Sequence, residues 1–123
     1  MDFIIYRIYY GPTLIAYVGQ TTQGIEKRLY QHFFSNVDLS FKDVRKIEYA
    51  KCKSRADMNL YEIYYINKDK PFENLNYISK DQLTVSLPPL EFVDFDLNLL
   101  SKYKVNDKHI MNRNIKSNSN VTY

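Results

Sequence analysis

The strongest constraint on the fold lies in the first twenty residues, where two apolar runs flank a Gly-Pro turn. In the first run, Ile4, Tyr6 and Ile8 recur at a period of two, which is typical of a strand with one face in the core. Gly-Pro-Thr follows at residues 11–13, and the second apolar run, Leu-Ile-Ala-Tyr-Val, begins directly after it. Glycine and proline favour turns, so the two runs predict a β-hairpin.

Three further segments follow the hairpin. Residues 25–34 carry apolar side chains four apart and predict an amphipathic helix, for which Thr22 can supply the N-terminal cap. Residues 44–52 alternate as a third strand, and Asp57 is expected to start a second helix that ends before Pro71. The order strand, strand, helix, strand, helix predicts an α+β fold with a small three-stranded sheet.

The chain is long enough for one domain with a single core. The compact part is expected to end in the stretch Ser-Leu-Pro-Pro-Leu-Glu-Phe-Val-Asp-Phe-Asp at residues 86–96. We therefore assign residues 1–100 to the domain and residues 101–123 to a basic, Asn- and Ser-rich tail that we expect to be flexible. The charged side chains of this tail are Lys102, Lys104, Asp107, Lys108, Arg113 and Lys116.

Composition excludes several classes of protein. The only cysteine is Cys52, which rules out an internal disulfide and a cysteine-based zinc cluster and fits a reducing compartment. No apolar run reaches the length of a membrane span, and the N-terminus has no small-residue cleavage site. We expect a soluble cytoplasmic protein, and its net charge of +3 permits binding to a polyanion without requiring it.

Polar side chains suited to catalysis gather around the hairpin and the two predicted helices. Arg28 and His32 are four residues apart and share one helix face, near the hairpin residues Tyr6 and Tyr17. Glu62 lies among apolar neighbours in the second helix, where a carboxylate needs a partner or a metal. Taken singly, the tyrosines could be half-buried strand residues, the arginine and histidine a solvated helix face, and the glutamate the partner of a lysine.

As an ordered set, residues 3–76 resemble the GIY-YIG endonucleases, a family named after two tripeptides on its first two strands. Ile4-Ile5-Tyr6 is similar to the first tripeptide, and Tyr17-Val18-Gly19, followed by Gln20-Thr21, is similar to the second. The family's helical arginine, the residue four positions later, its metal-binding glutamate and its late asparagine correspond to Arg28, His32, Glu62 and Asn74. The sequence departs from the family pattern at two positions, with Ile4 in place of a glycine and Gln20 in place of a lysine that some members carry.

The resemblance implies an antiparallel sheet with flanking helices and the hydrolysis of phosphodiester bonds in DNA. In such a site Glu62 would hold one Mg²⁺ or Mn²⁺ ion, and the planar guanidinium of Arg28 would bind the scissile phosphate. DNA would be held through its phosphates, with low sequence specificity.

The remaining site residues have roles that the resemblance leaves partly open. Tyr6 and Tyr17 would contact a phosphate oxygen or the attacking water, and either one is a candidate base. His32 would orient one tyrosine or accept its proton, and Asn74 would brace the site.

Two other functions are compatible with the residues. One is a catalytically inactive module that binds nucleic acid through a nuclease-like fold, and the other is a small interaction module whose tyrosines belong to the core. The abundance of Asn, Lys, Ile and Tyr is typical of AT-rich coding, as in many phages. The sequence predicts neither the oligomeric state nor the target sequence.

Overall fold

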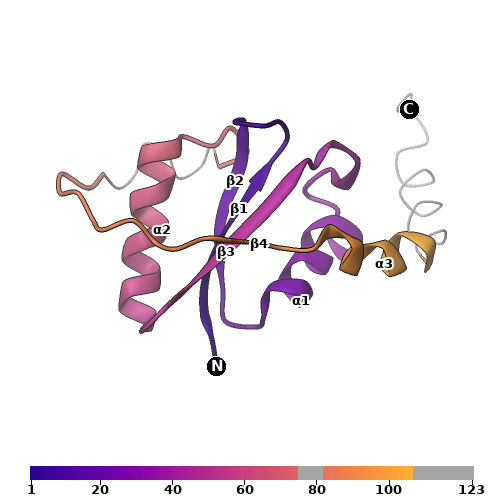
Figure 1. Ribbon diagram of the computed structural model, residues 1–123, viewed down its shortest axis with the longest axis horizontal. Coiled ribbons are helices and arrows are strands. Elements are labelled where there is room, and N and C mark those ends of the chain that lie inside the picture. The colour runs from indigo at the N-terminus through magenta and orange to yellow at the C-terminus, as the bar shows by residue number, and fades with distance from the viewer. Residues whose placement is uncertain (75–81, 107–123) are drawn as a thin grey trace.

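A four-stranded sheet forms the centre of the fold and carries helices on both of its faces (Figure 1). The computed structural model describes residues 1–74 and 82–106. Its strands are antiparallel in the order β2-β1-β3-β4 and span β1 (Phe3–Tyr9), β2 (Ile15–Thr21), β3 (Lys46–Cys52) and β4 (Val93–Asp94). Its helical segments are α1 (Ile25–Tyr30), the π-type turn η1 (Gln31–Ser35), the 3₁₀ turns η2 (Phe41–Asp43) and η3 (Leu97–Leu100), α2 (Arg55–Asp69) and α3 (Ser101–Asn106). None of these described helices is long and apolar enough to cross a membrane.

The predicted hairpin is confirmed, and its register sets which side chains share a face. Tyr6 of β1 lies opposite Gly19 of β2, and Ile8 lies opposite Tyr17. Because successive side chains of a strand point to opposite faces, these four residues lie on one face and Val18 lies on the other.

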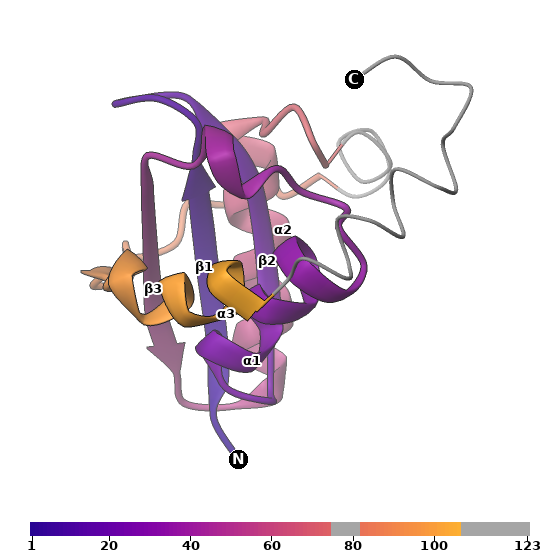
Figure 2. The ribbon, with the colours of Figure 1, turned by 90° about the vertical axis from the view of Figure 1, so that its right-hand side faces the viewer.

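Each face of the sheet has its own apolar core. On the face covered by α1 and η3, the buried residues are Tyr6, Ile8, Leu29, Phe33, Phe34, Leu39, Val44, Ile47, Phe95 and Leu100. On the face covered by α2, they are Ile5, Val18, Met58, Tyr65 and Ile66. Figure 2 shows α1 and α3 lying over the first face, with α2 behind the sheet. Side chains from the two faces can therefore meet only around an edge of the sheet.

The sheet has a fourth strand where the sequence predicted three. β4 pairs with Glu48 and Tyr49 of β3, and the N–H of Phe95 donates to the carbonyl of Ile47 at 2.8 Å. Phe95 and Leu100 then enter the core, so the segment that was expected to end the compact part completes the sheet. A strand of two residues is too short to show a period of two, and it forms because β3 offers an open edge.

The first helix differs from its predicted form at both ends. The predicted cap at Thr22 is wrong, because α1 begins after Gly24, whose φ of 95° strongly favours glycine. The helix then widens at η1, where the N–H of Asn36 donates to the carbonyl of Gln31. This wide turn buries three consecutive side chains, His32, Phe33 and Phe34.

The second helix begins earlier than predicted. Ser54 is its N-terminal cap, and the Ser54 hydroxyl accepts a hydrogen bond of 3.0 Å from the N–H of Asp57. Asp57 therefore lies in the first turn and does not start the helix. The helix ends at Asp69, and Pro71 follows it, as the sequence predicted.

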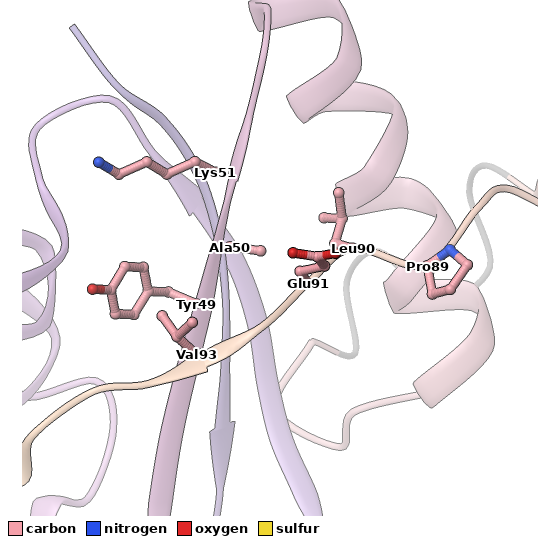
Figure 3. Close-up of a pocket in the computed structure, with 7 residues that line it drawn as sticks. All are labelled: Tyr49, Ala50, Lys51, Pro89, Leu90, Glu91 and Val93. Carbon is pink, nitrogen blue, oxygen red and sulfur yellow. The ribbon is translucent and has the colours of Figure 1, made fainter.

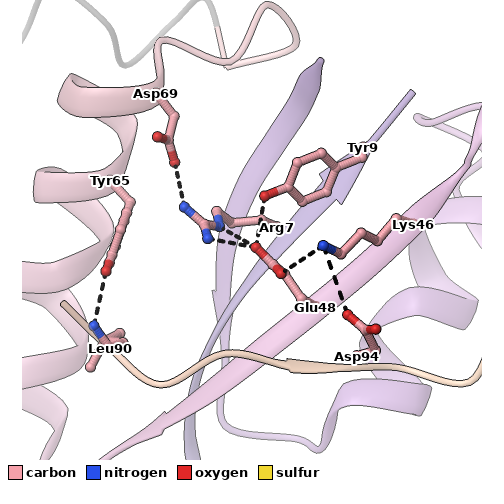
Figure 4. A network of polar contacts seen from close by, with 8 residues as sticks. All are labelled: Arg7, Tyr9, Lys46, Glu48, Tyr65, Asp69, Leu90 and Asp94. Carbon is pink, nitrogen blue, oxygen red and sulfur yellow. Dashed lines mark hydrogen bonds and ion pairs between the residues drawn. The ribbon is translucent and has the colours of Figure 1, made fainter. Parts of the chain in front are cut away.

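A polar network around Arg7 ties β1, β3 and α2 together (Figure 4). The Arg7 Nε donates to Glu48 at 2.8 Å, and its Nη1 donates to Asp69 of α2 at 3.1 Å. The guanidinium also lies 4.0 Å from the ring centroid of Phe92, in the segment that leads to β4. This network explains why an arginine lies within an otherwise apolar strand. The Arg7 guanidinium is bonded to Glu48 and Asp69 and therefore serves the stability of the fold.

The beginning of the predicted tail packs on α1. Lys102 Nζ lies 2.9 Å from a carboxylate oxygen of Glu26, and the Tyr103 hydroxyl donates to the same oxygen at 2.6 Å. These two contacts lower the pKa of Glu26. The rest of the predicted tail, residues 107–123, lies outside the described residues.

Candidate active site

Tyr6 and His32 form a buried pair on the α1 face of the sheet. Tyr6 is at the middle of β1, and both side chains are fully buried. The Tyr6 hydroxyl lies 2.6 Å from His32 Nε2, and the wide turn η1 is what directs the imidazole toward β1. The predicted grouping of Tyr6 with His32 is present in the structure, and the simpler explanation of His32 as part of a solvated helix face is wrong.

Asp38 fixes the protonation of this pair. Its carboxylate lies 3.0 Å from His32 Nδ1, and because a carboxylate only accepts hydrogen bonds, Nδ1 carries the proton. Nε2 then accepts the hydrogen bond from Tyr6. Burial lowers the pKa of His32, which keeps the imidazole neutral near pH 7. Asp38 was not predicted, because it lies outside any regular element and its spacing from His32 carries no pattern.

Tyr17 lies beside this pair and is more accessible. Its ring centroid is 6.1 Å from that of Tyr6 and 4.9 Å from that of His32. Unlike Tyr6, which is completely buried, Tyr17 is partly exposed. The two tyrosines therefore differ in their access to a substrate, a difference that the sequence did not predict.

Arg28 joins the tyrosines from α1. Its Nη1 donates to the side-chain oxygen of Gln31 at 3.0 Å. Burial raises the pKa of Tyr6 well above its ordinary value and Tyr17 adds to the rise, whereas the neighbouring Arg28 guanidinium opposes it and Glu62 makes a small further contribution. Tyr17, Arg28 and Glu62 therefore lie within electrostatic reach of the Tyr6 hydroxyl, and that hydroxyl is protonated at neutral pH.

Gly19 allows the rings to reach the edge of the sheet. A Cβ atom at this position would lie 2.5 Å from the Tyr6 hydroxyl oxygen and 2.7 Å from Cε2 of Tyr17. Only a residue without a side chain leaves room for both rings. The glycine of the second tripeptide thus serves the packing of the site directly.

We expect Gly19→Ala to lower the free energy of unfolding by about 1–3 kcal/mol, because the added methyl group displaces two packed rings. Urea unfolding measures this change, and cleavage should fall with it. Gly11→Ala is the matched control, since a Cβ there meets its nearest atom, Leu14 Cβ, at 3.3 Å. Equal stability of the two variants would contradict the packing role of Gly19.

Glu62 approaches from the opposite face of the sheet. It lies on α2, and its Oε1 accepts a hydrogen bond of 2.7 Å from Gln20 Nε2 at the end of β2. Burial raises the pKa of this carboxyl, and the bond from Gln20 offsets only part of the rise. The sequence assigned Gln20 no role in the site, whereas the structure makes it the hydrogen-bond partner of Glu62.

The surroundings of Glu62 fit a divalent cation with a largely open coordination shell. No lysine or arginine among the described residues forms an ion pair with it, so pairing with a lysine does not explain the acid. Within the same residues, no three His, Cys, Asp or Glu side chains are grouped as a metal cage. Mg²⁺ is commonly held by one or two carboxylates and completes its shell with water and phosphate oxygens. One partly buried carboxylate with an uncompensated charge matches that type of site.

Asn74 holds the outer edge of β2 where these groups meet. Its Oδ1 accepts from the N–H of Val18 at 2.8 Å, and its Nδ2 donates to the carbonyl of Val18 at 2.9 Å. Both backbone groups of Val18 are thus satisfied on an edge strand, between Tyr17 and Gly19. Asn74 is buried, and within the described residues its side chain bonds the backbone of Val18, which is a bracing geometry.

A polar cleft of about 280 Å³ runs along this edge. It is lined by Gln20, Thr21, Thr22, Gln23, Arg28, Gln31, Arg55 and Met58. Two larger cavities contain none of the predicted site residues: one of about 470 Å³ lies beside β3 (Figure 3), and one of about 510 Å³ lies beside the C-terminal half of α2. Of the predicted site residues, Arg28 lines the cleft along β2, and Gln20, the hydrogen-bond partner of Glu62, lines it as well.

Comparison with known proteins agrees with this geometry. The family model described as the GIY-YIG catalytic domain matches residues 2–76, which is more than half of the chain. No curated protein and no solved structure matches the chain significantly.

Proposed function

This chain belongs to the GIY-YIG nuclease family, and from that premise we propose that it is a metal-dependent endonuclease that hydrolyses phosphodiester bonds in DNA. The observation that carries the proposal is that two sets of side chains act on the Tyr6 hydroxyl near the end of β2. Tyr6, His32 and Arg28 come from one face of the sheet, and Glu62 comes from the other. A module that only bound nucleic acid would have no use for a half-buried carboxylate without a cation partner.

Hydrolysis places extra negative charge on the phosphate oxygens and on the leaving oxygen in the transition state. Arg28 is suited to the first of these, because its guanidinium is permanently charged and can bond two phosphate oxygens at once. The Tyr6 hydroxyl gives its proton to the hydrogen bond with His32, so its lone pairs remain directed toward Arg28. Tyr6 and His32 are thus positioning residues for the arginine.

Tyr17 is the tyrosine that we assign to the substrate, because it is partly exposed beside Arg28 while Tyr6 is buried. Its phenolic oxygen would accept a hydrogen bond from the attacking water, and its phenolate form would take the proton of that water. Asn74 keeps Tyr17 in place by fixing the adjacent backbone of Val18.

Glu62 would hold one Mg²⁺ or Mn²⁺ ion, which when bound supplies positive charge near the leaving oxygen. Gln20 orients the carboxylate by donating to one of its oxygens and leaves the other available. The contacts available in the cleft suit a phosphate backbone, so we propose that DNA is bound with low sequence specificity.

Incubation with supercoiled plasmid DNA tests the proposal. We expect conversion to the nicked form with Mg²⁺ or Mn²⁺ and none with EDTA, because the leaving oxygen then lacks its stabilising charge. The absence of nicking with either metal, by a protein whose fold is confirmed by circular dichroism, would refute it.

The two tyrosines should respond differently to loss of the hydroxyl. We expect Tyr17→Phe to lower kcat by about 10² or more, since it removes a group that contacts the reacting atoms. Tyr6→Phe should lower the free energy of unfolding by about 1–3 kcal/mol, because the buried His32 Nε2 loses its donor. Urea unfolding and single-turnover cleavage separate the two effects. Wild-type cleavage by Tyr17→Phe would remove that residue from the reaction.

A further inference from the structure

The cleft along β2 contains a second arginine that the family pattern does not assign. Arg55 is the first residue of α2 and lines the cleft together with Arg28. Of the eight lining residues, these two are cationic and none is acidic. Threonine and glutamine side chains make up most of the remaining wall, and they can donate hydrogen bonds to an anion. The lining therefore has the charge and the donors of an anion-binding surface.

The contacts of Arg55 within the described residues are with uncharged groups. Its guanidinium is exposed, and it contacts the thioether of Met1 at 3.3 Å and lies 5.6 Å from the ring centroid of Phe3. No carboxylate within the described residues forms an ion pair with Arg55, whereas Arg7 is held by two acids. Thioether sulfur is a weak acceptor, so a phosphate can replace it at little cost.

The position of Arg55 on α2 relates it to Glu62. The two residues are seven apart, which places them two turns apart on the same helix face, with Met58 between them. Two turns correspond to about 10 Å along the helix axis. The phosphates of one B-form strand follow each other at about 3.4 Å of axial rise. Arg55 is therefore too far from Glu62 to bind the phosphate at which Glu62 acts. It is close enough to bind another phosphate farther along the same DNA strand.

We propose that Arg55 binds a phosphate of the DNA strand a few nucleotides from the scissile bond and thereby contributes to substrate affinity. This inference rests on the proposed function, because it takes Glu62 and Arg28 as the point of cleavage. Arg28 would act on the reacting phosphate, and Arg55 would act only on binding. The α2 end of the cleft thus sets the path of the strand beyond the active site.

Binding of a short fluorescent duplex in EDTA, over a series of salt concentrations, tests this role. For Arg55→Ala we expect weaker binding and a slope of log affinity against log salt that is smaller by about 0.9, because one phosphate contact is lost. Arg55→Lys keeps the charge and should retain most of the slope. Arg45→Ala is the matched control, since Arg45 is also exposed but bonds backbone carbonyls at the other end of the sheet. Equal slopes for Arg55→Ala and wild type would overturn the inference.

Cleavage kinetics separate this inference from the proposed function. With Mg²⁺, Arg55→Ala should raise KM roughly tenfold and leave kcat within about twofold, as expected for a contact made equally in the bound and transition states. A fall in kcat with unchanged KM would overturn the binding role. If wild type cleaves and Arg55→Ala matches it in both assays, only this inference fails. If wild type neither binds nor cleaves DNA, the proposed function fails with it.

Discussion

Glu62→Gln is expected to lower kcat for DNA cleavage by about 10³ or more while leaving the protein folded, since it removes the charge that we assign to the proposed cation. The amide has the shape of the carboxylate, and its oxygen can still accept the hydrogen bond from Gln20. Single-turnover cleavage in saturating Mg²⁺ measures the rate. Glu91→Gln is the matched control, because Glu91 is an exposed glutamate outside the cleft.

The same substitution should alter the pH dependence of stability. Burial raises the pKa of Glu62, so the folded state binds its proton more tightly than the unfolded state does. The resulting stability is present below the unfolded pKa of about 4.3 and is lost as pH rises through the folded pKa. The Tm of Glu62→Gln relative to wild type should therefore increase from about pH 4 to about pH 7 in the absence of metal.

Two outcomes would contradict this account of Glu62. Cleavage at the wild-type rate by Glu62→Gln would show that the carboxylate holds no essential cation. A Tm of Glu62→Gln below that of wild type at neutral pH would show that the charged carboxylate stabilises the fold. That result would disagree with the raised pKa of Glu62. Adding Mg²⁺ should raise the Tm of wild type and not that of the variant, because a ligand stabilises only the protein that binds it.

Arg28→Ala is expected to lower kcat by about 10² or more with little change in KM, because its guanidinium is assigned to charge that develops in the transition state. Arg28→Lys should recover only part of the rate, since an ammonium group cannot bond two phosphate oxygens in one plane. Lys27→Ala is the matched control, because Lys27 is the exposed preceding residue on α1. Steady-state cleavage of a defined duplex gives both constants.

A rise in KM at constant kcat would move Arg28 from the reaction to ground-state binding, the role that we assign to Arg55. Full recovery of kcat by Arg28→Lys would show that a point charge suffices. In either case the hydrogen bond between Tyr6 and His32 would have to be explained as core structure alone.

Several features of the fold follow directly from local sequence. The period of two in Ile4, Tyr6 and Ile8, with a Gly-Pro turn after it, predicted the hairpin that the structure contains. The second helix was predicted from Asp57, which lies in its first turn, and from Pro71, which follows its end. These elements were predictable because their signals lie within a few residues of each other, where local backbone preferences decide the conformation.

The structure differs from the predictions made from the sequence where a distant segment or a side-chain contact decides the conformation. β4 exists because β3 offers it an edge, and η1 is wide because it buries His32 against Tyr6. Neither cause appears in a local pattern. The Ser54 cap was missed for a smaller reason, since several residues near the start of α2 are able to cap a helix.

For the candidate site, the sequence determined which residue types are present and in which order. Their resemblance to a known family indicated the class of reaction. Only the tertiary structure decided how they meet, because the site wraps around an edge strand and joins two faces of the sheet. Tyr6 is buried and Tyr17 is accessible, although both are tyrosines on neighbouring strands. Asp38 and Gln20 enter the site only through contacts with His32 and Glu62 across loops and between elements. Burial and hydrogen bonding depend on the whole chain, and they are what distinguish side chains of the same type.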